Sequence, residues 1–282
     1  MDDLIIHKRD ATNIPDLLDG TVDLTVTDPP YLVLNREDLY RGKKLKPIQR
    51  NVEFDHMSFR DYTKLISGFT KETYRYTRDG GTFISFMAAE YLGLLKHFGE
   101  RAGFTWRMAL FLEKSNPAPK VHLTTPQQSV EVAGFMTKGK KNCTFNATNG
   151  GLCHNIWKYP LVDRTRRVHP TQKPFSLVEN WIKLFSNVGD LIVDPFAGSG
   201  VVGEAARLNN RRYFISDLDV SYVEKKNKNE IEYKPKNWTS TQELLTTTNE
   251  SAIITDDENS FAKKVLNDHR HIFFNNEGEM KI

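Results

Sequence analysis

The sequence predicts an α/β protein with a largely parallel β-sheet, and three observations support this prediction. Apolar, strand-like runs alternate with stretches of helical spacing along most of the chain. Two distinctive loops, 28–31 and 194–200, each follow such an apolar run. In parallel sheets, ligands bind beyond the carboxyl ends of the strands, where these loops are expected. The 282 residues, 39% of them hydrophobic, suffice for one or two domains with a sizeable core and exclude a wholly disordered chain.

The expected elements have ordinary lengths. Alternation at 22–27 indicates a strand, and the helical spacing of 59–76 indicates a helix that Gly80-Gly81 should end. Two segments are less regular: 32–55 is polar and longer than most connections, which predicts a mobile functional loop, and 113–167 is rich in proline and loop residues. Further strands are expected at 82–86, 104–112, 130–136, 191–193 and 213–215, and further helices at 91–101, 175–186 and 200–208.

Charge divides the chain into two parts. Residues 237–282 carry eight acids and four bases, a net charge of −4, which leaves +7 for residues 1–236 of a chain whose total is +3. We therefore predict a main domain at 1–236 and a polar, acidic C-terminal appendage at 237–282. The acidic N-terminus and the lack of an apolar run near ~18 residues predict a soluble, cytoplasmic protein with no secretion or membrane signal. The two cysteines cannot build a four-cysteine zinc site, and no metal is expected.

The loop 194–200 follows an apolar strand and opens a helix. Its glycines let a ligand approach the backbone, and the helix N-terminus offers free N–H groups. Gly198, Gly200 and Gly203 also match the pattern GxGxxG, and Asp217 follows 19 residues after Gly198. A dinucleotide-binding site is therefore an alternative. Asp194 opposes that alternative, because its carboxylate would repel a pyrophosphate. S-adenosylmethionine, which has an ammonium group and a ribose but no phosphate, suits both acids.

The loop Asp28-Pro29-Pro30-Tyr31 follows the first expected strand. Two consecutive prolines lack N–H groups and have a fixed φ, so the loop is stiff and its carbonyls stay free to accept hydrogen bonds. A carboxylate and a rigid carbonyl can accept both hydrogens of one exocyclic amine, which draws the nitrogen toward tetrahedral geometry and frees its lone pair. Tyr31 offers a face on which a planar base can stack. An ordinary turn without a catalytic role is the alternative.

Together with His169-Pro170-Thr171-Gln172-Lys173-Pro174, these loops resemble the motifs of the amino-group DNA methyltransferases, in the order typical of their β (permuted) group. The resemblance covers about residues 4–228. It implies a Rossmann-like, S-adenosylmethionine-dependent methyltransferase fold, with a mostly parallel sheet and helices on both faces. It implies catalytic roles for Asp28, Pro29, Pro30 and Tyr31. It implies cofactor binding by Asp10, Ala11, Thr171, Gln172, Lys173, Asp194, Phe196, Ala197, Gly198, Ser199, Gly200 and Asp217.

The implied reaction is direct methyl transfer to the exocyclic N6 amine of an adenine flipped out of double-stranded DNA. Aspartate as the first residue of the catalytic loop favours adenine within the family, and cytosine N4 is the alternative. Segment 169–174 and the loop order weigh against an RNA or protein-glutamine methyltransferase, and the intact loops weigh against a catalytically inactive DNA-binding protein. Neither Cys143 nor Cys153 lies in a proline-preceded loop, so methylation at cytosine C5, which needs a cysteine nucleophile, is not expected.

DNA binding predicts basic side chains near the site, since phosphate neutralisation supplies most of the non-specific affinity. Segment 113–167 is the candidate target-recognition region, and Lys114 and Glu131 resemble the family's segment leading into it. Each basic group could instead belong to a solvated loop. The resemblance also implies a restriction–modification setting and, in a prokaryote or virus, association with the nucleoid; a homodimer is compatible with it. The candidate DNA-binding residues are Arg36, Arg41, Lys43, Lys44, Lys46, Arg50, Lys138, Lys140, Lys141, Arg164, Arg166 and Arg167.

Overall fold

The computed structural model describes residues 3–32, 57–117, 126–141, 143–147, 153–160 and 172–228. Within these residues the strands form one sheet in the order β1-β8-β7-β2-β3-β5-β4-β6. All neighbouring strands pair in parallel except β5, which is antiparallel to both β3 and β4. The strands are β1 (Ile6–Lys8), β2 (Val22–Thr27), β3 (Thr77–Met87), β4 (Phe104–Lys114), β5 (Val130–Lys138), β6 (Ile156–Tyr159), β7 (Leu191–Asp194) and β8 (Arg212–Asp217).

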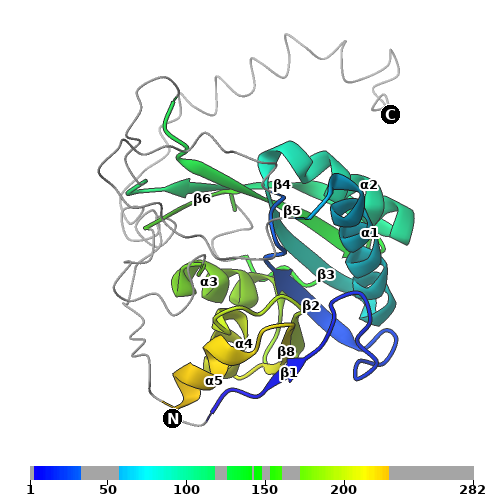
Figure 1. The fold of residues 1–282 in the computed structure, drawn as a ribbon, viewed down its shortest axis with the longest axis vertical. Helices are drawn as coiled ribbons and strands as arrows, with labels where there is room; N and C mark the ends of the chain where they lie inside the picture. The colour runs from blue at the N-terminus through cyan, green and yellow to red at the C-terminus, as the bar shows by residue number, and fades with distance from the viewer. Residues whose placement is uncertain are drawn as a thin grey trace, which may run out of the picture. The chain divides into compact units, whose positions relative to one another are not determined.

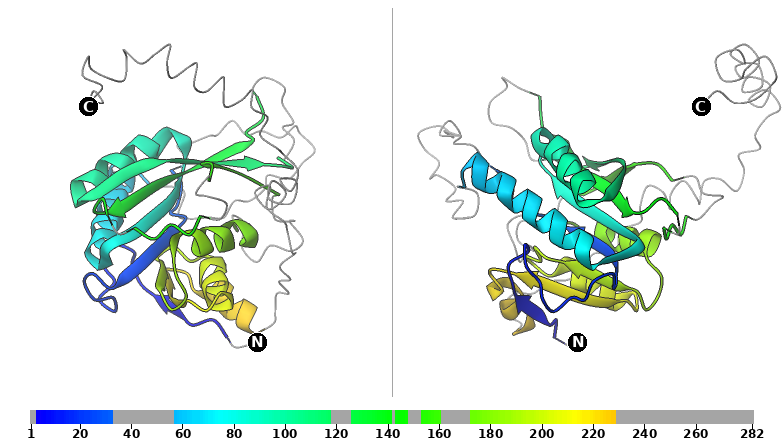
Figure 2. Two further views of the ribbon diagram at one scale, coloured as in Figure 1. Left: turned by 180° about the vertical axis from the view of Figure 1, so that it is seen from behind. Right: turned by 90° about the vertical axis from the view of Figure 1, so that its right-hand side faces the viewer.

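Helices cover both faces of the sheet (Figures 1 and 2). On one face, α1 (Phe59–Tyr76) and α2 (Leu92–Ala102) bury apolar side chains such as Phe69 against Phe83 of β3. On the other face, α3 (Phe175–Phe185) and α4 (Val201–Leu208) pack against the sheet, where Trp181 contacts Phe86. A short α5 (Ser221–Asn227) lies beside α4, and a 3-10 turn spans Ala89–Tyr91. The mostly parallel sheet with helices on both faces is therefore confirmed.

The structure corrects one boundary. We expected Gly80-Gly81 to end the first long helix, but α1 ends at Tyr76 and the two glycines lie inside β3. The pairing of β2 with β3 jumps from Val22↔Thr77 to Leu24↔Thr82, so the glycines form a bulge. Gly80 has a φ of +78°, which other residues rarely adopt. The chain passes directly from α1 into β3 at Thr77, so the helix ends without a glycine, and the two glycines serve the bulge instead. The short elements β1, β6 and α5 were not expected from the sequence.

The topology brings the ends of many strands to one edge of the sheet. The register pairs Lys8 with Asp217, Asp194 with Ile215, and Thr27 with Ser85, so five parallel strands end together. Since β5 runs in the opposite direction, it starts at this edge, and Glu131 lies opposite Leu112 of β4. Both predicted loops, 28–31 and 194–200, emerge here. We refer to it below as the carboxyl edge.

Several predicted features lie outside the described residues: the polar loop from residue 33 to 55, much of 113–167, and the appendage at 237–282. The part of 113–167 that is described includes β5, a strand between β3 and β4 in the sheet. The target-recognition role stays a prediction for the segments around that strand. In the part of the chain that the structure describes, no helix is long and apolar enough to cross a membrane, and no cluster of His, Cys, Asp and Glu could hold a metal ion.

Candidate active site

The loop 28–31, for which the resemblance implies a catalytic role and which we call the catalytic loop, begins with Asp28 immediately after β2. Its Oδ2 atom lies 2.9 Å from Nζ of Lys173. Its Oδ1 atom is buried and accepts no hydrogen bond from the described residues. Burial raises the pKa of this carboxyl group, although the Lys173 ammonium opposes the rise. A buried carboxylate oxygen without a partner is costly, and a ligand N–H would satisfy it.

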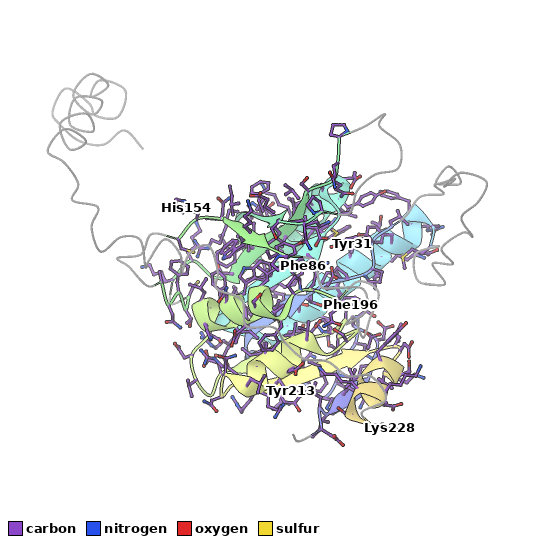
Figure 3. The ribbon with its side chains drawn as sticks, turned by 90° about the vertical axis from the view of Figure 1, so that its left-hand side faces the viewer. Tyr31, Phe86, His154, Phe196, Tyr213 and Lys228 are labelled. Atoms are coloured by element: carbon purple, nitrogen blue, oxygen red, sulfur yellow. The ribbon has the colours of Figure 1, made fainter. Side chains whose placement is uncertain are left out.

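Lys173 lies at the centre of the site, next to the start of α3. Its Nζ atom is 3.3 Å from Oε2 of Glu131 and 3.4 Å from the Tyr31 hydroxyl. The same atom lies over two aromatic rings, 4.6 Å from the centroid of Phe86 and 5.4 Å from that of Tyr31; Figure 3 labels both rings. Burial lowers the pKa of Lys173, but the surrounding anions, Asp28 first, raise it well above the usual value. The side chain therefore stays an ammonium.

Glu131 extends this arrangement with a second lysine. Its Oε1 atom lies 2.8 Å from Nζ of Lys114 at the end of β4. Burial would raise the pKa of Glu131, but the ammonium groups of Lys173 and Lys114 lower it to about 2. From the sequence, both residues are expected at the border of the recognition region, and their contact with the catalytic loop is not expected. A signal was present, because each occupies a strand end, but using it requires knowing that β5 is antiparallel.

The glycine loop carries the second acid. Oδ1 of Asp194 accepts hydrogen bonds from the Thr27 hydroxyl at 2.7 Å and from the Phe196 N–H at 3.0 Å. Burial raises the pKa of Asp194 to about 7. The loop turns at Gly200, whose φ is +74°; an added Cβ would lie 3.0 Å from Cγ2 of Val223. The backbone conformation favours glycine at that position, and the close packing would make a larger residue displace Val223 slightly.

Asp217 and Asp10 lie at the ends of the next two strands. Oδ2 of Asp217 accepts the N–H of Gly198 at 2.8 Å, which joins the third acid to the glycine loop. Asp10 follows β1, and its Oδ1 atom accepts the backbone N–H and the hydroxyl of Thr12 at 2.9 and 2.8 Å. Ala11 is buried. Asp10, Asp217 and Asp194 thus follow one another across adjacent strands.

This set of residues fits S-adenosylmethionine. The glycine loop allows close approach to the backbone, and the three acids can accept hydrogen bonds from ribose hydroxyls and an ammonium group. Phe196 adds an apolar surface, held edge-on against Phe69 with ring centroids 5.4 Å apart. Of the segment at 169–174, Thr171 lies outside the described residues, and Gln172 is buried. Lys173, which the resemblance places with the cofactor, makes its ion pairs with Asp28 and Glu131.

The lysines at 138, 140 and 141, which we expected to bind DNA, lie at the edge of the sheet opposite the carboxyl edge. Lys138 ends β5, beside the start of β3, so about 26 Å of strand separates it from the carboxyl edge. Its Nζ donates to the carbonyls of Tyr74 and Thr77 at 3.0 and 2.8 Å. The antiparallel strand thus carries its end away from the catalytic loop, and the DNA-binding role of these lysines stays a prediction. The other predicted DNA-binding residues lie outside the described residues.

Comparison with known proteins agrees with this geometry. A family model described as DNA methylase, for N6 and N4 methylation, matches residues 22–229. The type II methyltransferase M.HpaI of Haemophilus parainfluenzae is 26% identical over 243 residues, covering 79% of this chain and 73% of the relative. The orphan methyltransferase M.BamHII of Bacillus amyloliquefaciens is 26% identical over 258 residues, covering 73% of this chain and 87% of the relative.

Solved structures share the fold. The crystal structure of the M1.HpyAVI–SAM complex has a TM-score of 0.62 at 23% identity and covers 79% of this chain and 98% of that chain. PvuII DNA methyltransferase (cytosine-N4-specific) has a TM-score of 0.60 at 16% identity, covering 77% of this chain and 83% of that chain. Since the family model spans most of the sequence, this chain belongs to the N6/N4 family of DNA methylases.

Proposed function

We propose that the protein methylates the exocyclic N6 amine of adenine in double-stranded DNA, with S-adenosylmethionine as the methyl donor. The observation that carries the proposal is the buried Oδ1 atom of Asp28, which has no hydrogen-bond partner among the described residues. This acceptor opens a proline-stiffened loop at the same edge of the sheet as Asp194 and the glycine loop. Bound there, S-adenosylmethionine supplies an electrophilic methyl group.

The protein's part in this reaction is to hold the amine and expose its lone pair. Asp28 and the backbone carbonyl of Pro29 accept the two amine hydrogens, and Tyr31 stacks on the base. Because the amine is inaccessible inside a duplex, the base must leave the stack first. The rate then comes from positioning and polarisation of the amine, without a covalent enzyme intermediate.

The choice of adenine rests on the first residue of the catalytic loop. Within the amino-group methyltransferases that this sequence resembles, aspartate at this position favours adenine. Cytosine N4 is the second candidate, because the PvuII enzyme, a cytosine-N4-specific methyltransferase, shares the fold with a TM-score of 0.60. The order of the two loops along the chain supports placement in the β (permuted) group.

Nucleoside mass spectrometry tests the proposal directly. Plasmid DNA is incubated with the protein and S-adenosylmethionine, then digested and compared with DNA incubated without the protein. We expect 6-methyladenine as the new nucleoside. Finding 4-methylcytosine in its place would overturn the choice of base, and labelled methyl transfer to RNA or protein but not to DNA would overturn the substrate class. Single-molecule sequencing of the same DNA would return the recognition sequence.

Lys138→Met tests whether the edge of the sheet opposite the carboxyl edge stays free of DNA. Because the Lys138 ammonium is held by two carbonyls and lies over the Tyr74 ring at 4.3 Å, the substitution should lower the midpoint of urea unfolding. The dependence of DNA affinity on salt should keep its slope, since no phosphate contact is lost. Fluorescence anisotropy at several salt concentrations measures that slope. A slope reduced by about one unit would show that Lys138 contacts DNA after all.

A further inference from the structure

Four charged side chains join end to end beside the catalytic loop. Asp28 pairs with Lys173 at 2.9 Å, Lys173 with Glu131 at 3.3 Å, and Glu131 with Lys114 at 2.8 Å. They come from four separate places in the sequence: the loop after β2, the start of α3, β5 and β4. The side chains of Lys173 and Lys114 are only 10% and 14% exposed. We call this group the charge chain.

The charge chain uses the two oxygens of Asp28 unequally. Oδ2 faces the Lys173 ammonium, whereas Oδ1 is buried and accepts no hydrogen bond within the described part of the protein. The two oxygens of a carboxylate are equivalent, so what the ion pair fixes is the plane of the group: one oxygen faces Lys173, and the other occupies the unpaired position of Oδ1. The pair therefore orients the carboxylate and keeps one oxygen available to accept a hydrogen bond from a ligand amine.

Lys173 is itself held from its other side. Glu131 faces its ammonium, and the rings of Phe86 and Tyr31 lie within 4.6 and 5.4 Å of Nζ. These rings limit the access of water that could take over the role of a charge partner. Two carboxylates and two ammonium groups balance, so the charge chain is neutral as a whole. Losing one member leaves its neighbour buried without a full partner, which is unfavourable.

We propose that Lys173 is a positioning residue for methyl transfer: it holds Oδ2 of Asp28 so that Oδ1 can accept a hydrogen bond from the target amine. Glu131, anchored by Lys114, keeps the Lys173 ammonium in place. The proposal rests on the proposed function only in that the partner of Asp28 is the amine of a DNA base. It applies equally to adenine and cytosine. It gives Lys173 a role different from contact with the cofactor.

Two groups of variants test this proposal, with a matched control. Lys173→Met removes the charge and keeps most of the volume, and Lys173→Arg restores the charge. Glu131→Gln removes the anchor at nearly constant shape. Asp61→Asn is the control, because Asp61 forms an ion pair with Lys64 on α1, outside the candidate recognition region, and both side chains are more than 50% exposed. Circular dichroism establishes that each variant folds; if Lys173→Met does not fold, Glu131→Gln carries the test.

We expect kcat at saturating DNA and S-adenosylmethionine to fall about 100-fold in Lys173→Met and about tenfold in Glu131→Gln. Lys173→Arg should recover part of the loss, and Asp61→Asn should keep the activity of the unmodified protein. The Kd for S-adenosylmethionine, measured by calorimetry, should change less than about threefold in all variants. A weaker Kd with an unchanged kcat would assign Lys173 to the cofactor and overturn the proposal.

The pH dependence gives a readout that a purely structural role would not move. Burial raises the pKa of Asp28 and Lys173 opposes the rise, so removing the ammonium should raise that pKa further. The acidic limb of the kcat profile should then move to higher pH in Lys173→Met. The other titratable groups that influence or face Asp28 are Glu131, Tyr31, Tyr62, Tyr159 and Asp194. An acidic limb that stays in place would overturn the proposal.

A direct titration separates this proposal from the proposed function. Carboxyl carbon NMR of aspartate-labelled protein, with Asp28 assigned through Asp28→Asn, follows the carboxylate without any substrate. We expect its midpoint to rise in Lys173→Met, because the ammonium that opposes the rise is lost, and to fall in Glu131→Gln, because the neighbouring negative charge that raises the pKa of Asp28 is lost. Absence of methyl transfer to DNA by the unmodified protein would refute the proposed function while this titration still decides whether Lys173 controls Asp28. An unchanged midpoint in Lys173→Met would refute the proposal that Lys173 controls the protonation of Asp28.

Discussion

Replacing Asp28 with alanine is expected to reduce methyl transfer to DNA about 1000-fold or more, while the affinity for S-adenosylmethionine changes little. Alanine removes the acceptor that is aligned with the amine, and loss of one such preorganised group typically costs about 10²–10³ in rate. The loss should be larger here because the Lys173 ammonium, still paired with Glu131, would then face the amine as a positive charge. Tritium transfer to plasmid DNA measures the rate, and calorimetry measures cofactor affinity.

The fold should survive this substitution. Asp28 lies in a loop after β2, and Lys173 keeps Glu131 as a partner, so the buried ammonium is not left alone. Asp79→Ala serves as a control, because Asp79 is an exposed residue near the beginning of β3, far from the carboxyl edge. Activity at the level of the unmodified protein in Asp28→Ala would end its catalytic assignment. Loss of cofactor binding in parallel would show that the loop also supports the cofactor.

Replacing Asp194 with asparagine should weaken the affinity for S-adenosylmethionine about 10–100-fold, the usual range for a lost charge-assisted hydrogen bond. The pKa of Asp194, raised by burial to about 7, adds a pH dependence. Below pH 7 the carboxyl group is protonated and attracts a cationic ligand less. For the unmodified protein we therefore expect a Kd about tenfold weaker at pH 6 than at pH 8.

Asp194→Asn provides the control for this pH dependence, since any change of the Kd with pH that remains in this variant must come from the ligand or from other groups. The folding stability of the ligand-free protein should change with pH in the opposite direction to the affinity. The pKa of Asp194 is higher in the folded chain than in the unfolded one, so stability is greatest at low pH and falls as pH rises through about 7. Urea unfolding at pH 6 and pH 8 measures that fall. A Kd equally independent of pH in both proteins would show that Asp194 does not face the cation.

The local motifs and their order along the chain can be recognised without the structure. Asp28-Pro29-Pro30-Tyr31 and the glycine loop at 194–200 are contiguous, and each follows an apolar strand. Local chemistry is sufficient for such motifs, because proline stiffness, glycine conformations and strand alternation act over a few residues. Their positions at strand ends then predict that they meet at one edge of a parallel sheet.

The distant side chains that contact the catalytic loop are known only from the fold. Lys173 lies 145 residues after Asp28, and Glu131 lies between them on a strand whose direction no local pattern reveals. The antiparallel direction of β5 has two consequences. It brings Glu131 to the carboxyl edge beside Lys173, and it carries Lys138 to the far edge, away from the catalytic loop. Strand direction follows from the packing of the whole sheet, so the charge chain could not be derived from the sequence alone.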